Sequence, residues 1–129
     1  MKFARLVFLI AGIWGVLTLT PLYFIYNMIG QKDPPPVTHP GFYYGFAGVA
    51  LAWQFAFFAI AKDPVRFRLM MIPAVLEKLG FGLPTVVLFV QRRLTASDLG
   101  LGCIDLLFAA LFLVAFGATA PQAPPSGRG

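Results

Sequence analysis

The sequence LGLGCIDLLFAALFLVAFGAT, residues 99–119, decides the fold class, because Asp105 is its only charged residue. An α-helix rises about 1.5 Å per residue, so about 20 apolar residues cross the hydrocarbon core of a bilayer, which is about 30 Å thick. Three other stretches of similar length and composition lie at residues 6–29, 42–61 and 69–90. The sequence therefore predicts four membrane-spanning segments.

The composition excludes an ordinary soluble domain. Hydrophobic residues make up 59% of the 129 residues and charged residues 12%, whereas soluble domains average about 45–50% and about 25%. The apolar residues are continuous and do not alternate, and four segments cannot close a β-barrel, so each segment must satisfy its backbone as a helix. We expect one all-α domain, an integral membrane four-helix bundle of residues 1–120. A disordered tail rich in proline and glycine, residues 121–129, is expected to follow it.

The distribution of positive charge predicts the orientation, because lysine and arginine are enriched in cytoplasmic loops. With the N-terminus inside, the inner side carries Lys2, Arg5, Lys62, Arg66, Arg68 and Arg128. The outer side then carries Lys32, Arg92 and Arg93. We expect a multi-pass protein of the cell inner membrane, with both termini cytoplasmic and an uncleaved first segment as anchor. The net charge of +5 is spread over loops, which favours membrane lipids over nucleic acid as the partner.

Prolines are expected to shape the first connection and two of the spans. Four prolines between residues 32 and 41 favour a stiff, extended connection. Pro21 and Pro84 each lack an amide hydrogen, which leaves the carbonyls of Leu17 and Gly80 without their helical partners. Such carbonyls need donors inside a bilayer, so the sequence predicts kinks and a cavity near them.

Small residues recur at intervals of about four, which lets helices in a bilayer approach closely. They are Gly41 with Gly45, Gly48 with Ala52 and Ala56, and Ala11 with Gly15; in the fourth span Gly100 and Gly102 precede Ala109 and Ala110. We expect contacts between helices of one chain, and a homo-oligomer or a larger membrane complex is the alternative.

The candidate site residues are the polar ones that a membrane span disfavours. Such groups cost at least about 2.5 kcal/mol each at the helix centre, so they face an interior and have a partner. Glu77 is expected about 12 Å and Gln54 about 10 Å from the inner boundary, with Trp14 and Trp53 at similar depth. Trp14, Trp53, Gln54 and Glu77 are therefore predicted to line one ligand-binding pocket.

A second polar layer is expected around Asp105, about 9 Å below the outer boundary. Glu77 and Lys78 are adjacent and point about 100° apart on a helix, so they are not expected to face the same neighbour. The long stem of Lys78 would allow a pair with Asp105, although the estimated depths of the two residues differ by about 7–8 Å. Structural hydrogen bonding, ligand contact and a proton or polar relay through Glu77, Lys78 and Asp105 all remain open.

Other chemistry finds little support. His39 and Cys103 are the only residues of their types, so a zinc or haem ligand set from one chain is not expected, and no cofactor is predicted. A dyad of Cys103 and His39 is the one catalytic alternative, but a cysteine in an apolar span is usually inert. The sequence contains no phosphate-binding loop, GxGxxG motif or serine nucleophile elbow, and no catalytic residue is assigned.

The motifs FYYGF (residues 42–46), WQ (53–54), DPxR (63–66) and EK (77–78) resemble those of small four-helix bacterial membrane proteins grouped as DoxX-like. The resemblance implies the four-helix fold more than any activity. Small multidrug transporters are similar in size, but their glutamate in the first span has no counterpart in residues 6–29.

Together these features predict a binding or accessory module with an intramembrane cavity for a lipid-like or other apolar small molecule. The alternative is a proton-coupled transporter or channel-like oligomer that uses Glu77 or Asp105. A membrane enzyme would need a nucleophile and a base, which the sequence does not bring together.

Overall fold

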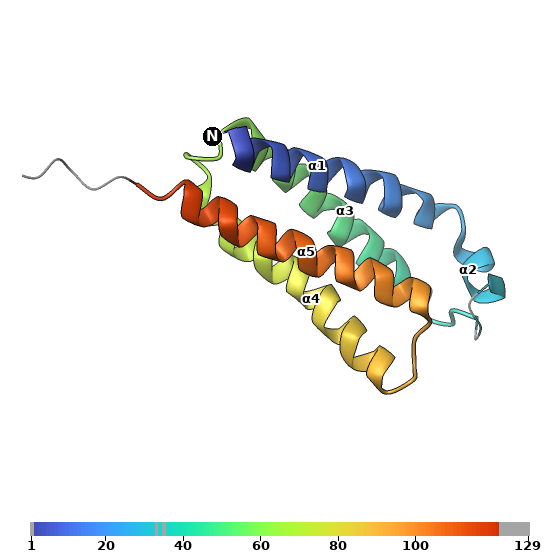
Figure 1. Ribbon diagram of the computed structural model, residues 1–129. Coiled ribbons are helices and arrows are strands. Elements are labelled where there is room, and N and C mark those ends of the chain that lie inside the picture. Colours follow the sequence, from blue (N-terminus) through green and yellow to red (C-terminus); the bar gives the residue numbers. More distant parts are fainter. Residues whose placement is uncertain (1, 33, 35, 122–129) are drawn as a thin grey trace, which may run out of the picture.

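The chain folds into helices joined by short loops (Figure 1), and this confirms the predicted all-α class. The computed structural model describes residues 2–32, 34 and 36–121, and no strand occurs within these ranges. The long helices are α1 (Lys2–Leu19), α3 (Pro40–Lys62), α4 (Met71–Val90) and α5 (Ala96–Ala118). The short helices are η1 (Thr20–Tyr23), α2 (Tyr26–Lys32) and η2 (Arg68–Met70). Most of the expected tail, residues 122–129, lies outside the described residues.

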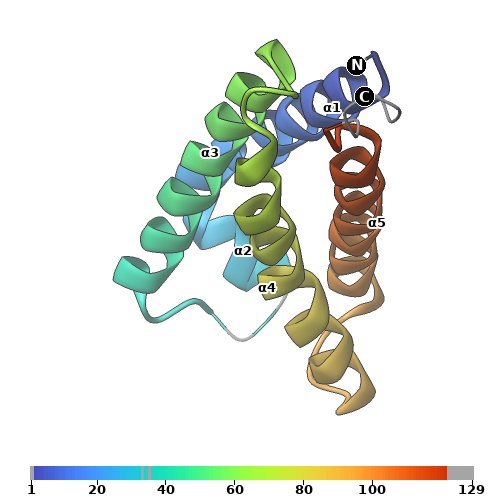
Figure 2. The ribbon, with the colours of Figure 1, turned by 90° about the vertical axis from the view of Figure 1, so that its left-hand side faces the viewer.

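The four long helices form two closely packed pairs. Helix α1 packs along α3, and α4 packs along α5, while contacts between α1 and α5 join the pairs. Helices α3 and α4 touch at few positions, and Figure 2 shows them diverging, so that the start of α3 and the end of α4 lie well apart. The start of α1 and the end of α5 lie at one end of the bundle, called here the terminal end; the opposite end carries α2 (Figure 1).

The surface of the bundle is apolar. Four helical segments are long and apolar enough to cross a membrane: Lys2–Tyr23, Pro40–Lys62, Arg68–Val90 and Ala96–Ala118, with mean hydropathies of 1.9, 1.6, 1.5 and 2.4. Large apolar side chains point outward from each segment, among them Leu17, Val49, Leu76 and Leu107. A soluble monomer rarely exposes a continuous apolar surface of this extent.

The first segment ends earlier than the expected residue 29. Helix α1 stops at Leu19, tightens into η1 through Tyr23, and the chain then turns before α2 begins. The cause is Pro21, whose ring cannot donate to the carbonyl of Leu17 and clashes with it. Pro84 has a milder effect, because α4 continues past it to Val90.

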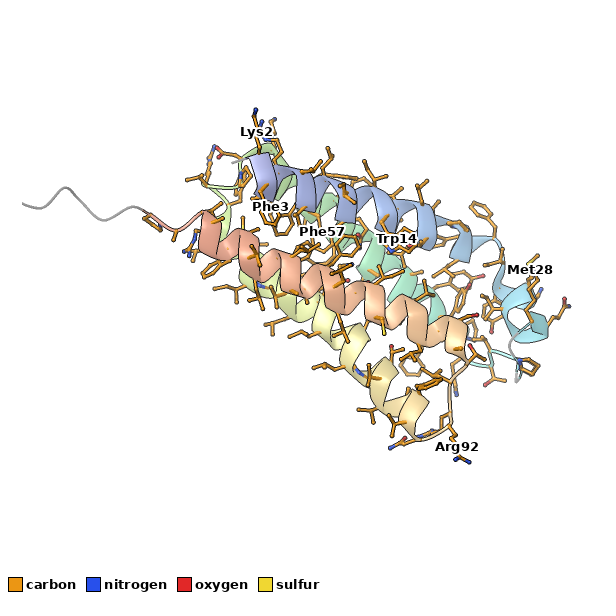
Figure 3. The ribbon with its side chains drawn as sticks, viewed as in Figure 1. Lys2, Phe3, Trp14, Met28, Phe57 and Arg92 are labelled. Carbon is orange, nitrogen blue, oxygen red and sulfur yellow. The ribbon has the colours of Figure 1, made fainter. Side chains whose placement is uncertain are left out.

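The well-packed core occupies the half of the bundle nearest the terminal end. Phe8 stacks on Phe112 with ring centroids 4.2 Å apart, and Phe57 meets Phe112 edge-on at 5.1 Å. Alanines of all four long helices surround these rings: Ala4, Ala11, Ala61, Ala74, Ala109 and Ala115. Figure 3 shows Phe57 in this half and Trp14 farther along, toward α2. The aromatic core therefore leaves the other half of the bundle free to hold cavities.

Only some of the small-residue motifs make the expected contacts. A Cβ atom on Gly15 would overlap the side chain of Gln54, and one on Gly102 would meet Thr85 at 2.6 Å. No atom of another described segment lies within 4 Å of a Cβ built on Gly41 or Gly45. The expectation of a close helix contact within the chain is therefore wrong for the Gly41–Gly45 motif.

Hydrogen bonds to backbone carbonyls tie the two ends of the bundle. At the terminal end, Arg5 Nε donates to Ala61 O at 3.2 Å, and Arg68 Nε donates to Phe116 O at 3.0 Å. At the opposite end, the Tyr43 hydroxyl donates to Leu22 O at 2.7 Å. These bonds satisfy carbonyls that the helix ends leave open and hold the loops against the bundle.

Candidate functional site

Lys78 lies at the centre of a charged cluster in the middle of the bundle. Its side chain is only 4% exposed, and Nζ lies 3.4 Å from Asp105 Oδ1 and 3.7 Å from Glu77 Oε2. The rings of Phe57 and Phe108 lie beside the ammonium, with centroids 5.2 Å and 5.5 Å from Nζ. The lysine is thus held by two carboxylates and two aromatic faces, which offset the cost of burying its charge.

This cluster shows which partners the Lys78 side chain reaches. Lys78 pairs with Asp105 although the estimated depths of the two residues disfavoured the pair, and it also reaches the adjacent Glu77. Those depths are depths of Cα positions, whereas the flexible four-carbon stem of a lysine carries its charge well away from its own Cα. The two predicted polar layers are therefore one layer.

Gln54 on α3 is buried beside the cluster, with 1% of its surface exposed. Its Nε2 donates to Ala50 O at 2.7 Å, while Oε1 accepts no hydrogen bond from the described part of the chain. The amide lies against α1 at Gly15, where a Cβ atom would overlap the Gln54 side chain. Gly15 therefore makes the room in which Gln54 reaches the bundle interior.

A cavity of about 220 Å³, called here the polar cavity, lies between these residues and the end of the bundle that carries α2. Polar side chains of four helices line it: Thr18, Gln54, Glu77, Lys78, Asp98 and Asp105. Apolar side chains from α1, η1 and α2 complete the wall, with Trp14 among them. The cavity thus combines charged side chains on one part of its lining with apolar side chains on most of the rest.

A second and larger hollow, called here the apolar groove, runs between α3 and α4 and has a volume of about 710 Å³. Gly45 and Gly80 open it, because no atom of another described segment lies within 4 Å of a Cβ built on either residue. Trp53 and Leu76 contribute apolar wall. The groove exists because α3 and α4 touch at few positions.

Glu77 belongs to the linings of both hollows. Phe46, Ala50 and Phe81 also line both, so this shared set of side chains borders both the polar cavity and the apolar groove. The carboxylate of Glu77 lies where the charged cavity meets the apolar groove. Such a boundary is the environment that a molecule with one polar and one apolar end requires.

The predicted ligand-binding residues do not line a single pocket. The structure places Trp14 and Gln54 in the lining of the polar cavity, Trp53 in that of the apolar groove and Glu77 in both. Trp14 and Trp53 were expected at similar depth, but their helices present them to different hollows. Depth along a helix axis does not determine the direction in which a side chain points.

Sequence reasoning missed Phe46, Phe81 and Asp98. Asp98 lies in the first turn of α5, where its backbone amide donates to Thr95 Oγ1 at 3.3 Å. The spacing of Thr95 and Asp98 is typical of a helix N-terminus, and that signal could have placed Asp98 inside α5. Nothing in the sequence distinguishes Phe46 and Phe81 from the other phenylalanines.

The two residues considered for other chemistry lie apart from these hollows. Cys103 is exposed on α5, and His39 precedes α3, with its ring 5.7 Å from that of Phe42. In the described ranges, no group of three or more histidine, cysteine or acidic side chains is arranged to hold a metal ion.

These observations define an all-helical bundle with four helices apolar enough to span a membrane and a charged cluster in its interior. Comparisons with models of known protein families, with curated proteins and with solved structures give no match.

Proposed function

We propose that this chain is a multi-pass protein of the cell inner membrane, with its four long helices in the bilayer and both termini in the cytoplasm. The apolar outward faces of the helices support this placement, because lipid chains accept such a surface and water does not. Five positive residues flank the spans at the terminal end and support the orientation: Lys2, Arg5, Lys62, Arg66 and Arg68. The resemblance to DoxX-like membrane proteins belongs to this proposal as well.

Within the bilayer, the protein acts as a binding or accessory module for a lipid-like or other apolar small molecule. The observation that carries this function is that Glu77 lines both the polar cavity and the apolar groove. A chain lying in the groove would place its polar end against the charged cluster. The groove volume of about 710 Å³ falls within the range of about 300–1,000 Å³ that is usual for small-molecule sites.

The cost of the charged cluster also favours a binding role. Burying an ion pair gains little stability relative to apolar residues of the same volume, and each ionisable group in a span adds an insertion cost. A bundle that needed only packing would be served by leucine at positions 77, 78 and 105. The terminal half of this bundle, with its phenylalanine and alanine core, is an example of such packing.

Filling the apolar groove tests the function. Gly45→Leu and Gly80→Leu each add a side chain where the groove is open, and Gly41→Leu adds the same side chain on α3 outside the residues that line it. After gentle extraction, native mass spectrometry should find a small apolar adduct on the wild type and on Gly41→Leu. It should find little or none on Gly45→Leu and Gly80→Leu. Equal adduct in all four folded proteins would refute the binding function.

A proton-coupled transporter is the second candidate, because Glu77 and Asp105 face one lysine and can exchange protons within a single cluster. Proteoliposomes with a pH gradient and an internal pH-sensitive dye test it. Proton flux that is lost in both Glu77→Gln and Asp105→Asn supports transport. Flux no faster than that of empty liposomes removes this candidate.

A further inference from the structure

Two buried hydrogen-bond acceptors beside the polar cavity have no donor within the described residues. Gln54 Oε1 and Glu77 Oε2 are buried and accept no hydrogen bond within the described residues. The Gln54 amide nitrogen is already used, since it donates to Ala50 O at 2.7 Å. Lys78 donates to Asp105 at 3.4 Å, and its nitrogen is 3.7 Å from Glu77 Oε2, beyond hydrogen-bonding distance.

The hydroxyl group lining this cavity does not supply the missing donor. Thr18 directs its proton to the backbone of its own helix, at Trp14 O and Gly15 O, 2.9 Å and 3.3 Å away. Buried polar atoms in proteins nearly always have a partner. The amide oxygen of Gln54 and the carboxylate oxygen of Glu77 therefore lack the partner that buried acceptors normally have, and an N–H group on an occupant of the cavity would supply it.

The charge of the lining points to the same kind of occupant. The charged cluster at the polar cavity holds two carboxyl groups, those of Glu77 and Asp105, and one ammonium group, that of Lys78. An anionic head group would meet an excess of negative charge at close range. A cationic head group would be attracted, and its N–H groups would make charge-assisted hydrogen bonds, which are the stronger kind.

We propose that the occupant is an amphiphile whose polar end is a protonated primary amine. Its ammonium group lies in the polar cavity between Gln54 Oε1 and Glu77 Oε2, and its apolar chain lies in the groove beside Trp53. This inference rests on the binding function proposed above and names its ligand class. A free long-chain amine and the ethanolamine head of a phospholipid both carry this chemistry.

The two tryptophans allow the position of each end to be measured, because Trp14 lines the polar cavity and Trp53 lines the apolar groove. Trp14→Phe leaves Trp53 as the only tryptophan, and Trp53→Phe leaves Trp14. Both variants are reconstituted in phosphatidylcholine nanodiscs and titrated with dodecyl chains that carry a quenching bromine at the far end. The heads compared are amine, trimethylammonium, alcohol and carboxylate.

We expect the brominated amine to quench the fluorescence of Trp53 in a saturable way. It should quench Trp53 more strongly than Trp14. The amine should act at a concentration at least about tenfold lower than the carboxylate or the trimethylammonium compound, which lack either the positive charge or the N–H donors. Glu77→Gln and Gln54→Met should each weaken the preference of the amine over the alcohol several-fold. Asp63→Asn, which changes a carboxylate in the loop after α3, should leave it unchanged.

The outcomes distinguish the assignment of an amine ligand from the binding function itself. If the carboxylate binds as tightly as the amine while Gly45→Leu abolishes both, the amine assignment falls and the binding function stands. Equal affinity of the trimethylammonium compound overturns the hydrogen-bond argument. If the quenching by every chain is the same in the wild type and in Gly45→Leu, both the amine assignment and the binding function are overturned. Helical circular dichroism identifies a misfolded variant, and Gln54→Met then serves in place of Glu77→Gln.

Phosphatidylethanolamine nanodiscs identify the source of the amine. A several-fold higher apparent dissociation constant of dodecylamine in these discs than in phosphatidylcholine shows that the phospholipid head competes for the cavity, which supports the lipid as ligand. An unchanged constant with tight amine binding supports a free long-chain amine.

Discussion

The Lys78 ammonium lies 3.4 Å from the Asp105 carboxylate and joins α4 to α5 in the interior of the bundle. The side chains of the two residues are 4% and 15% exposed, so neither charge is well solvated. The pair is therefore costly to break, because removal of one partner leaves the other buried and uncompensated.

Asp105→Ala should destabilise the protein by about 3 kcal/mol, because it leaves the buried Lys78 with a single carboxylate as its partner. The double variant Lys78→Met with Asp105→Leu should lose clearly less, because it removes both charges together. Reversible unfolding in mixed detergent micelles measures both. A double variant that is less stable than Asp105→Ala would contradict the assignment of the loss to an unpaired charge.

Gly15→Ala should destabilise the protein by about 1–3 kcal/mol, because the new methyl group overlaps the Gln54 side chain and overpacking has costs of this size. Gly100→Ala is the matched control, since no atom of another described segment lies within 4 Å of a Cβ at that position. Combining Gly15→Ala with Gln54→Ala should recover part of the loss. Strictly additive effects in this double-mutant cycle would show that the two residues do not interact.

Phe112→Ala should cost about 3–5 kcal/mol, the usual range for truncating a buried phenylalanine. Phe112 is fully buried between Phe8 and Phe57, whereas Leu113, the next residue, is 57% exposed. In a bilayer Leu113 faces lipid, so Leu113→Ala should cost little. Thermal unfolding of the two variants in the same detergent compares them. Similar losses would contradict the burial of Phe112 and the exposure of Leu113.

Cysteine labelling tests the orientation in the membrane. In a Cys103→Ala background, Val65→Cys places a thiol in the loop at the terminal end, and Gln91→Cys places one just after α4. A membrane-impermeant maleimide added to intact spheroplasts should label Gln91→Cys and spare Val65→Cys. Lysis should then expose Val65→Cys to the reagent. The reverse pattern would place both termini outside.

The polar residues of the site are predictable because the sequence alone shows which polar groups lie within apolar stretches, where their insertion into a membrane costs free energy. An amide or a charged group within an apolar stretch is expensive wherever the helix lies, so the sequence alone singles out Gln54, Glu77, Lys78 and Asp105. Their partners cannot be predicted in the same way. A helix can rotate about its axis without any change in its hydropathy, and the rotation decides which neighbour a side chain meets.

Hydropathy and length alone determined that the chain forms four long apolar helices, because both are properties of a continuous segment and need no knowledge of its neighbours. The tertiary structure decided that Trp14 and Trp53 line different hollows, that Lys78 reaches Asp105, and that Glu77 lies between cavity and groove. It also decided that α1 packs on α3 and α4 on α5, leaving α3 and α4 apart. The physical reason is that apolar surface attracts without direction, whereas close approach at Gly12 and Gly102 and the fit of Phe8, Phe57 and Phe112 select one arrangement of the helices.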